Sequence, residues 1–477
     1  MNDAPLQALV EIAQGHGRAW LVGGAVRDQL LGRSTLDYDI VVDGDVKGLA
    51  RALARSEGGH PFSLSEAFGA WRVKARDGGW QIDLTPLAGE TLEQDLARRD
   101  LTVNAIARAL ATGGPIGGEP GAARDLIDPF GGVADLRAGR LRMVGPESFS
   151  ADPLRTIRLV RLAVELQFEV DDLTAREAAA SAPDLPRVAP ERVFAELCQI
   201  VSCDRAVAGF ALMERVGVTA AVLPELLALR GVTQSDYHHL DAYDHTLTVL
   251  AEAVELGRQP GRVFGELGGE LAAVLAEPLA NELTRGVALR FGALLHDIAK
   301  SSTRSVAESG RVRFYGHDVL GAEMASEILT RLRASERLSA HVTALTRNHL
   351  RLGFLVDQRP LSRRDVYAYL AACEPVEVDV TLLSVADRLA TLGRNSERAV
   401  ESHLELAREI LPDALAWRAS RPRPPIRGDL LGRAIGLRPG PELGRLLEEL
   451  TVAAYAREVQ TEEQAVEHAR AWLAANQ

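Results

Sequence analysis

The chain has 477 residues, 47% of them hydrophobic and 25% charged, a length that excludes a single small binding module and predicts about three or four domains of roughly 100–200 residues. Its 54 Lys and Arg residues against 66 Asp and Glu residues give a net charge of −12, which taken alone argues against a nucleic-acid partner. Three cysteines without metal-site spacing exclude a disulfide framework and a cysteine-rich zinc site.

Residues 18–43 begin the chain's first α/β region. Their pattern predicts a strand, a glycine turn, a short helix and a second strand at residues 38–42. Further strands are expected at residues 71–74 and 80–84. Residues 97–108, ARRDLTVNAIAR, are expected to enter a helix, and IDPFGGVADL to form a turn and a helix start. The first domain is expected to close near residue 145.

Helical periodicity takes over from Asp152 and continues almost to the end of the chain. The Gly-rich residues 256–270 indicate a surface connection, and residues 285–412 a helical array. The prolines of SRPRPPIRGD, residues 420–429, predict a linker before a short helical tail. Since no basic leader and no run of about 18 apolar residues occurs, we expect a soluble, cytoplasmic protein without a membrane partner.

Two carboxylates and two glycines carry the strongest chemical signal of the first region. Asp37 and Asp39 stand two apart on a strand, so their side chains share a face and can both bind divalent ions. Gly23 and Gly24 precede a helix, where backbone N–H groups can approach a triphosphate. Asp83, on a later strand, is a candidate third carboxylate that polarises an attacking hydroxyl. Each feature alone is more often a turn or a solvated strand end.

Taken together, five ordered motifs resemble a known family. LVGGAVRDQLLG with LDYDIVV, ARRDLTVNAIA, IDPFGG, DPLRTIRLVRLAVELQF and ERVFAEL resemble the motifs of class II tRNA nucleotidyltransferases and their bacterial poly(A) polymerase relatives over about residues 18–200. The resemblance implies an α+β multidomain fold. It would comprise a polymerase-beta-like nucleotidyltransferase head, an all-α neck, a helical domain and a helical tail. The expected segments are 1–145, 146–235, 236–412 and 413–477.

The same resemblance assigns roles to individual residues. Asp37 and Asp39 would hold Mg²⁺, and Arg27 would join the two glycines in holding the triphosphate. The sugar and phosphates of the nucleotide would meet residues of the RRDLTVNA motif, namely Arg99, Asp100 and Asn104. The competing interpretation of RRD alone is a helix cap beside solvated arginines.

Base selection without a template is expected from the segment that follows the head. Asp152 and Arg155 stand three apart, and on one helical face they would present a fixed acceptor and donor edge that suits cytosine or adenine. Arg158 and Arg161 continue that face as further nucleotide contacts. The alternative is an ordinary surface ion pair.

A short interval favours one subtype of the family. Members that add the terminal adenosine resemble one another in a flexible loop before the RRD motif, whereas only 15 positions separate Asp83 from Arg98 here. This resembles the CC-adding subtype, which would take CTP and need a separate A-adding enzyme. The alternatives are a full CCA-adding enzyme that also takes ATP and, with less support, a bacterial poly(A) polymerase.

The second half of the chain carries a histidine and aspartate series on predicted helices. Imidazoles and carboxylates from different helices can converge on a divalent ion and activate water. The series resembles the HD phosphohydrolase domain, over about residues 236–400. The candidate ligands are His245, His296, Asp297, His317, His349 and Asp387. The pattern gives neither the identity of the metal nor whether the domain hydrolyses a substrate. The competing hypothesis is a protein of another class. It would be an HD phosphohydrolase that acts on RNA ends or nucleotides and whose N-terminal half binds RNA.

Arginines gather near the end of the chain. Residues 418–445 hold seven arginines against Asp429 and Glu442. The Pro-rich start is expected to be a solvated linker, whereas the part from Gly428 onward resembles family tails that grip tRNA. The expected tRNA contacts are Arg433, Arg438 and Arg445.

Overall fold

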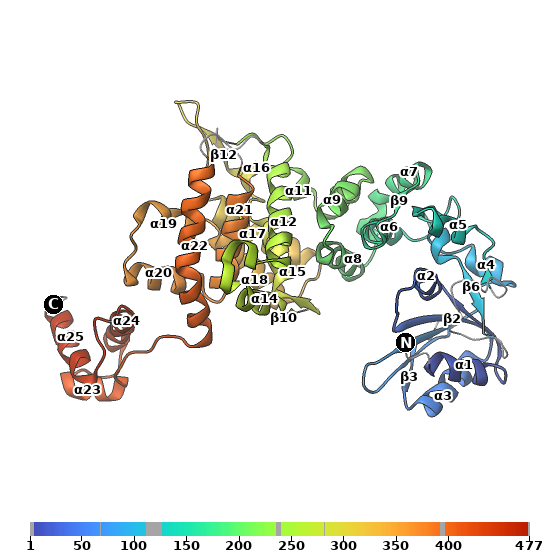
Figure 1. Ribbon diagram of the computed structural model, residues 1–477, viewed down its shortest axis with the longest axis horizontal. Coiled ribbons are helices and arrows are strands. Elements are labelled where there is room, and N and C mark those ends of the chain that lie inside the picture. Colours follow the sequence, from blue (N-terminus) through green and yellow to red (C-terminus); the bar gives the residue numbers. More distant parts are fainter. Residues whose placement is uncertain are drawn as a thin grey trace. The chain divides into compact units, whose positions relative to one another are not determined.

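The computed structural model describes residues 4–66, 68–110, 126–234, 240–280, 282–391 and 396–475 (Figure 1). The chain forms two compact units, one of Met1–Val188 with Ala211–Ala221 and one of Ala189–Phe210 with Val222–Gln477. Residues 146–188 of the expected neck therefore belong to the same unit as the head. The expected domain start at residue 236 lies outside the described residues.

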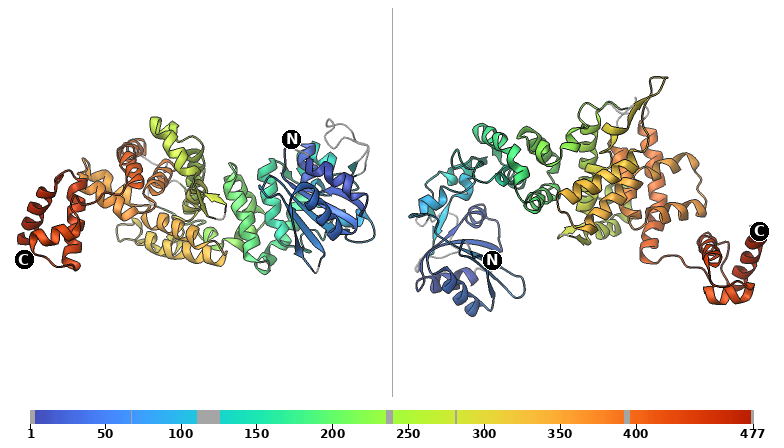
Figure 2. Two further views of the ribbon diagram at one scale, coloured as in Figure 1. Left: turned by 90° about the horizontal axis from the view of Figure 1, so that it is seen from below. Right: turned by 180° about the vertical axis from the view of Figure 1, so that it is seen from behind.

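A seven-stranded sheet organises the first unit. Its order is β3-β4-β5-β2-β1-β6-β7, with β2 and β5 parallel and the other pairs antiparallel. The helices α1 and α3 contact each other, and α3 packs against β3, β4 and β5, as Figures 1 and 2 show. The strands are β1 (Gly17–Val22), β2 (Asp37–Gly44), β3 (His60–Ser65), β4 (Ala70–Lys74), β5 (Gln81–Pro86), β6 (Ala107–Ala109) and β7 (Leu126–Ile127). The strands expected at 38–42, 71–74 and 80–84 are confirmed as β2, β4 and β5.

Short helices and turns complete this unit. The helical structure expected from Asp152 onward begins at Leu154 as α6, whose buried Leu154, Ile157 and Val160 recur at helical spacing. The elements are α1 (Ala4–Ala13), α2 (Gly24–Leu30), α3 (Val46–Glu57), α4 (Leu92–Leu96), α5 (Gly132–Arg137), β8 (Arg140–Leu141), α6 (Leu154–Leu166), β9 (Glu169–Val170), α7 (Asp172–Ser181) and η3 (Ala182–Arg187). Two further helices, α9 (Ala206–Arg215) and α10 (Val218–Val222), span the division between the units.

The expected helix entry at ARRDLTVNAIAR is wrong. Thr102–Asn104 form one 3-10 turn, η1, after which the chain enters β6 and Ala107 pairs with Val22 of β1. Tertiary hydrogen bonds decide this, because the Thr102 hydroxyl donates to Asp135 at 2.7 Å and Arg27 Nη1 donates to Asn104 Oδ1 at 2.7 Å. Partners so distant in sequence override the local helical pattern.

The second unit is helical, with small hairpins. Its helices and turns are α8 (Pro190–Ser202), α11 (Pro224–Leu227), α12 (Ala242–Arg258), α13 (Gly261–Phe264), η4 (Gly265–Leu267), α14 (Gly268–Ala276), α15 (Arg285–Leu295), α16 (Lys300–Thr303), α17 (His317–Arg331), α18 (Glu336–Asn348), α19 (Arg351–Leu355), η5 (Val356–Gln358), α20 (Arg363–Cys373), α21 (Glu377–Leu389) and α22 (Ser396–Ala419). The hairpin strands are β10 (Pro278–Ala280), β11 (Leu283–Thr284), β12 (Arg304–Val306) and β13 (Val312–Phe314). The hairpin of β12 and β13 interrupts the expected helical array, because Gly310 turns the chain at φ +78°.

The tail forms three helices with a core of their own. Helices α23 (Gly428–Ile435), α24 (Pro441–Tyr455) and α25 (Glu462–Ala475) bury Leu431, Leu446 and Leu450 together. Arg364 of α20 contacts Glu449 of α24 at 2.8 Å. The linker expected near residues 420–429 has no regular structure until α23 begins. None of the described helices has the length and apolarity needed to cross a bilayer.

Candidate active sites

The three carboxylates predicted for the head lie together on one face of the sheet. Asp37 and Asp39 begin β2, and Asp83 of β5 stands opposite Asp39 in the parallel register. The Gln81 side chain donates to Asp37 Oδ1 at 3.0 Å, which confirms the shared face at this edge. Alternate residues of the same strands, Ile40 and Ile82, are fully buried on the other face.

The charges around Asp39 suit a divalent cation. Desolvation in the site raises the pKa of Asp39, the carboxylates Asp37 and Asp83 raise it further, and Arg99 and Arg158 oppose them. Clustered carboxylates repel one another, and a bound Mg²⁺ would relieve that repulsion through hard oxygen ligands. The residues present therefore fit the metal.

Asp83 has a partner that the sequence did not predict. Arg72 of β4 holds both of its carboxylate oxygens, Nε at 2.6 Å from Oδ1 and Nη2 at 2.7 Å from Oδ2. Arg72 pairs with Asp83 in the antiparallel register, and its pKa is raised chiefly by this hydrogen bond. Both carboxylate oxygens of Asp83 thus accept hydrogen bonds in an ion pair with Arg72. Nothing in the sequence gives this pairing, because it depends on strand register.

The glycine turn brings backbone close to charged side chains. Gly23 has φ +73°, and a Cβ there would lie 2.8 Å from Arg99 Nη1 and 3.3 Å from Asp39 Oδ2. A larger residue would be strained and would displace both groups. Gly24 then begins α2, and a Cβ at this position would lie 3.4 Å from Arg27 Nη2. Both predicted glycines therefore border the carboxylate site.

The predicted nucleotide residues form a continuous hydrogen-bonded chain. Arg27 Nη1 donates to Asn104 Oδ1 at 2.7 Å, Asn104 Nδ2 donates to Asp100 Oδ1 at 3.0 Å, and Arg158 Nε donates to Asp100 Oδ2 at 2.7 Å. Burial works against the charge of Asp100, but Arg158, Asn104 and the Leu101 N–H outweigh it and lower its pKa. The neighbouring Asp28, which sequence reasoning missed, fixes Arg27 from the other side at 2.9 Å. These contacts hold each donor in one orientation.

The helical geometry expected for the base-selecting pair is wrong. Asp152 lies before the N-cap Pro153 of α6, and its carboxylate accepts from the Leu154 N–H at 3.2 Å. Arg155 donates to two backbone carbonyls, those of Ser148 at 2.9 Å and Arg98 at 2.6 Å. The short polar Asp before a proline stabilises the helix start instead of extending the helix.

Arg161, the last of the predicted nucleotide contacts, lies within α6. Its Nη1 donates to Glu165 Oε2 at 2.7 Å, four residues along the helix. The described contact is therefore an intrahelical ion pair.

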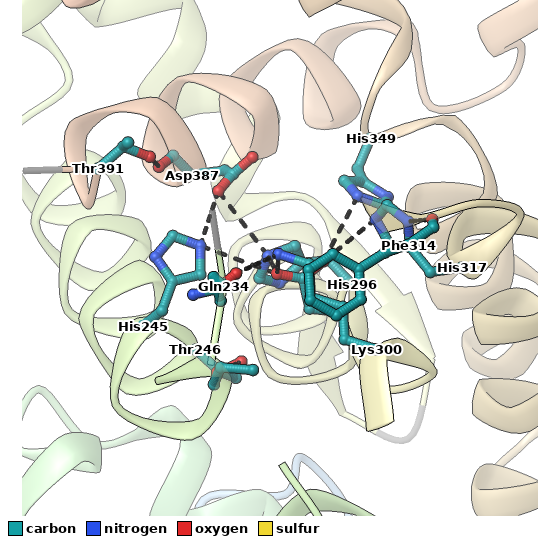
Figure 3. Close-up of polar contacts among 12 residues, drawn as sticks. Gln234, His245, Thr246, His296, Lys300, Phe314, His317, His349, Asp387 and Thr391 are labelled. Atoms are coloured by element: carbon teal, nitrogen blue, oxygen red, sulfur yellow. Dashed lines mark hydrogen bonds and ion pairs between the residues drawn. The ribbon is translucent and has the colours of Figure 1, made fainter. Parts of the chain in front are cut away.

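The six candidate ligands of the second half converge, although they come from five helical segments, and Figure 3 labels all of them except Asp297. His245 lies on α12, His296 and Asp297 follow α15, His317 begins α17, and His349 and Asp387 come from the end of α18 and from α21. Asp297 is the centre of the group. Its carboxylate is 3.0 Å from His296 Nε2 and 3.3 Å from His317 Nε2.

Backbone carbonyls orient three of these imidazoles. Nδ1 of His296, His317 and His349 lies 2.8, 2.7 and 2.6 Å from the carbonyl oxygens of Ala293, Phe314 and Thr346. A proton on Nδ1 leaves the lone pair of Nε2 available to bind a metal. Burial lowers the pKa of His349 to about 4, which keeps its imidazole neutral at physiological pH.

Two ligand groups share Asp297. One combines it with His245 and His296, the other with His317 and His349, and within each group the ligand atoms lie within 4.8 Å of one another. His245 Nε2 is also 2.9 Å from Asp387 Oδ1. All five grouped residues are buried. Buried nitrogen and carboxylate ligands at this spacing fit divalent metal.

Two polar residues of this site were missed by the sequence reasoning. Lys300 Nζ lies 2.6 Å from Asp297 Oδ2 and donates to Gln234 at 2.6 Å. Burial opposes the charge of Asp297, but His296 and Lys300 lower its pKa well below the usual range. Lys300 stands three residues after Asp297 on the way into α16, a spacing that could have indicated it.

The arginines of the tail are less concentrated than the sequence count indicated. Arg418 pairs with Glu277, and Arg421 pairs with Glu374. Both glutamates lie outside the Arg-rich segment. The three predicted contacts are exposed, and Arg433 lies 3.7 Å from Asp429. The other two, Arg438 and Arg445, stand on either side of the start of α24.

Family models match three segments between residues 19 and 392, and known proteins match nearly the whole chain. The poly A polymerase head domain matches residues 19–142, the probable RNA and SrmB-binding site of polymerase A residues 167–229, and the HD domain residues 242–392. An A-adding tRNA nucleotidyltransferase of Deinococcus radiodurans is 35% identical over 95% of both chains. A CC-adding tRNA nucleotidyltransferase of Thermus thermophilus is also 35% identical, over 94% of this chain and 92% of its own.

Solved structures show the same fold. A CCA-adding enzyme in an apo form matches with a TM-score of 0.64 at 21% identity, over 98% of this chain and 93% of that one. The Thermotoga maritima CCA-adding enzyme complexed with tRNA matches with a TM-score of 0.63 at 21% identity, over 99% and 95%. The expected mixed α/β head followed by helical regions is confirmed by this fold, and the expected HD region by its family model.

Proposed function

The chain belongs to the tRNA nucleotidyltransferase family, and from this premise we propose that it adds cytidines, but not the terminal adenosine, to the 3′ end of tRNA. The substrates would be tRNA and CTP, and a separate A-adding enzyme would complete the CCA end. Relatives with A-adding and with CC-adding names are equally similar to this chain. The choice between them therefore rests on one local feature.

That feature is the connection between β5 and α4, where adenosine-adding members carry a flexible loop. Only residues 87–91 separate the two elements here. The Leu87 N–H donates to Val42, the Ala88 N–H to the side chain of Asp95 at 3.0 Å, and the Glu90 N–H to the side chain of Gln94 at 2.7 Å. A connection held at three of five residues has little freedom to reorganise a pocket between two bases.

The residues of the head divide the work of nucleotidyl transfer. Asp37 and Asp39 would hold Mg²⁺, which when bound stabilises charge on the attacking and leaving oxygens. Gly23 and the chain from Arg27 through Asn104 position the triphosphate of CTP by donors whose orientations are already fixed. Asp152 and Arg155 remain our candidates for base selection. Arg155 would contact the base through N–H donors that do not bond its two backbone carbonyls.

An extension assay tests this proposal. Purified protein is incubated with tRNA ending at the discriminator base, with tRNA ending in CC, and with CTP or ATP alone. We expect two cytidines on the first substrate and no AMP on the second. Efficient AMP addition contradicts the CC-only assignment. Asp37→Ala should abolish extension; retained extension would contradict nucleotidyl transfer by this site.

A second activity is favoured by the two ligand groups around Asp297. A divalent metal there could activate water to hydrolyse phosphate esters at RNA ends or of nucleotides. The metal's identity is to be found by elemental analysis of the purified protein. Release of phosphate from a 3′-phosphorylated RNA, or opening of a 2′,3′-cyclic phosphate, should disappear in His245→Ala while CTP incorporation persists. Hydrolysis that survives in this variant argues against the site.

A further inference from the structure

The catalytic face of the head sheet continues past the carboxylates to an open edge. Two rows of paired residues cross the four adjacent strands β2, β5, β4 and β3. The first row is Asp39, Asp83, Arg72 and Phe62, and the second is Asp37, Gln81, Lys74 and His60. Paired residues on neighbouring strands point to the same face, so both rows run on from the proposed metal site.

The contacts along these rows confirm their common face. Gln81 bonds Asp37, and Arg72 bonds Asp83. The intervening residues point the other way: Val73 is fully buried, and Trp71 lies beneath the cations of Lys47 and Arg51 from α3. Helix α3 therefore covers the opposite face.

The outer end of the rows is apolar and basic at once. Phe62 is 45% exposed on the edge strand β3. Beside it, Lys74 and His60 are exposed. Arg72 uses Nε and Nη2 for Asp83, which leaves Nη1 for another acceptor. A flat aromatic ring flanked by cations is the combination that binds single-stranded nucleic acid.

The geometry of the reaction gives this surface an occupant. The residues that would hold the triphosphate, Gly23, Arg27 and Asn104, lie on the β1, α2 and β6 side of β2. In an in-line displacement the attacking hydroxyl arrives opposite the leaving pyrophosphate. The tRNA 3′ end must then come from the β5, β4 and β3 side.

We propose that these two rows are the track for the unpaired 3′ end of tRNA. Phe62 stacks on a base near the end, and Lys74 with Arg72 Nη1 contacts the phosphates. Three strand spacings of about 4.8 Å give a track of about 14 Å, the length of about four stacked nucleotides at ~3.4 Å each. Asp83 then acts as a positioning residue, since it holds Arg72 on the track. The proposal rests on nucleotidyl transfer to tRNA and not on the choice of CTP.

Steady-state kinetics of Phe62→Ala test the track. Stacking on one aromatic side chain predicts a rise of roughly 5- to 100-fold in KM for tRNA, with kcat and KM for CTP within about twofold of the parent. Phe62→Trp should restore the KM. Lys74→Ala should lower the salt slope of tRNA binding by about one. Phe354→Ala is the matched control, because Phe354 is 66% exposed on α19, far along the chain from these strands.

Photocrosslinking gives the direct readout. A benzoylphenylalanine at position 62 should crosslink to the last few nucleotides of a tRNA that ends at the discriminator base. Crosslinks confined to other parts of the tRNA, or an unchanged KM in Phe62→Ala, overturn the track. So does a dimer, seen by ultracentrifugation, that Phe62→Ala dissociates without altering the KM. If the enzyme adds adenosine instead of cytidine, the CC-only assignment fails. The KM for tRNA of the parent and of Phe62→Ala, measured with ATP, then still tests the track.

Discussion

The ion pair of Asp100 with Arg158 connects the residues that we propose to hold the nucleotide to α6, and its strength can be measured. Arg158 Nε lies 2.7 Å from Asp100 Oδ2, and the two side chains are 41% and 10% exposed. A pair about 4 Å apart at an effective dielectric of about 20 interacts by about 4 kcal/mol. The exposure of Arg158 lets water and salt screen the charges, so we expect about 1–2 kcal/mol of coupling.

A double-mutant cycle of Asp100→Asn and Arg158→Met measures this coupling. The free energy of unfolding is taken from urea titrations of the parent, both single variants and the double variant. Asp100→Asn should also raise KM for CTP by roughly tenfold, because the amide keeps a single acceptor oxygen, whereas Asn104 and Arg158 each bond a separate carboxylate oxygen of Asp100. Arg18→Met is the control, since Arg18 pairs with Asp43 at the surface and is not among the predicted nucleotide contacts. Additive effects on stability, within about 0.3 kcal/mol, would refute the coupling.

The same pair predicts a pH dependence. The pKa of Asp100 is lowered in the folded chain, so it lies below the unfolded value of about 3.9. Ionised Asp100 therefore stabilises the fold above that value, and the contribution is lost as the pH falls through the folded pKa. Asp100→Asn should weaken the acid-induced loss of stability below about pH 4. An acid limb identical to that of the parent would contradict this assignment.

Three further outcomes are expected. His296→Ala combined with Asp297→Ala should remove bound divalent metal, measured by elemental analysis, while tRNA extension persists; unchanged metal content would count against the site. Gly23→Ala should cut kcat/KM for CTP at least tenfold, because its Cβ would lie 2.8 Å from Arg99 Nη1, whereas near-parent kinetics would show that the turn can relax. Replacing the three exposed tail arginines by Gln should reduce the salt slope of tRNA binding by about two, and an unaltered slope would remove the tail from the interface; the positions are Arg433, Arg438 and Arg445.

The sequence by itself determined the family, the order of the domains and most of the residues that the structure brings together at the two candidate sites. Asp37 and Asp39 share a face because strand side chains alternate with period two, and this follows from local geometry alone. The order and residue types of the histidine and aspartate series also predicted a metal site, and the helices bring these side chains together. The net charge of −12 taken alone argued against a nucleic-acid partner, whereas the chain belongs to the tRNA nucleotidyltransferase family.

Tertiary structure alone decided what each side chain contacts. Arg72 holds Asp83 only because β4 and β5 pair in one register, and a shift of one residue would turn Arg72 to the other face. Thr102 and Asn104 leave the expected helix and bond Asp135 and Arg27, which are distant in sequence. The Arg155 side chain donates to backbone carbonyls instead of Asp152. Local periodicity fixes which face a residue occupies. The long-range hydrogen bonds that select its partner depend on strand pairing and packing, which no short stretch of sequence contains.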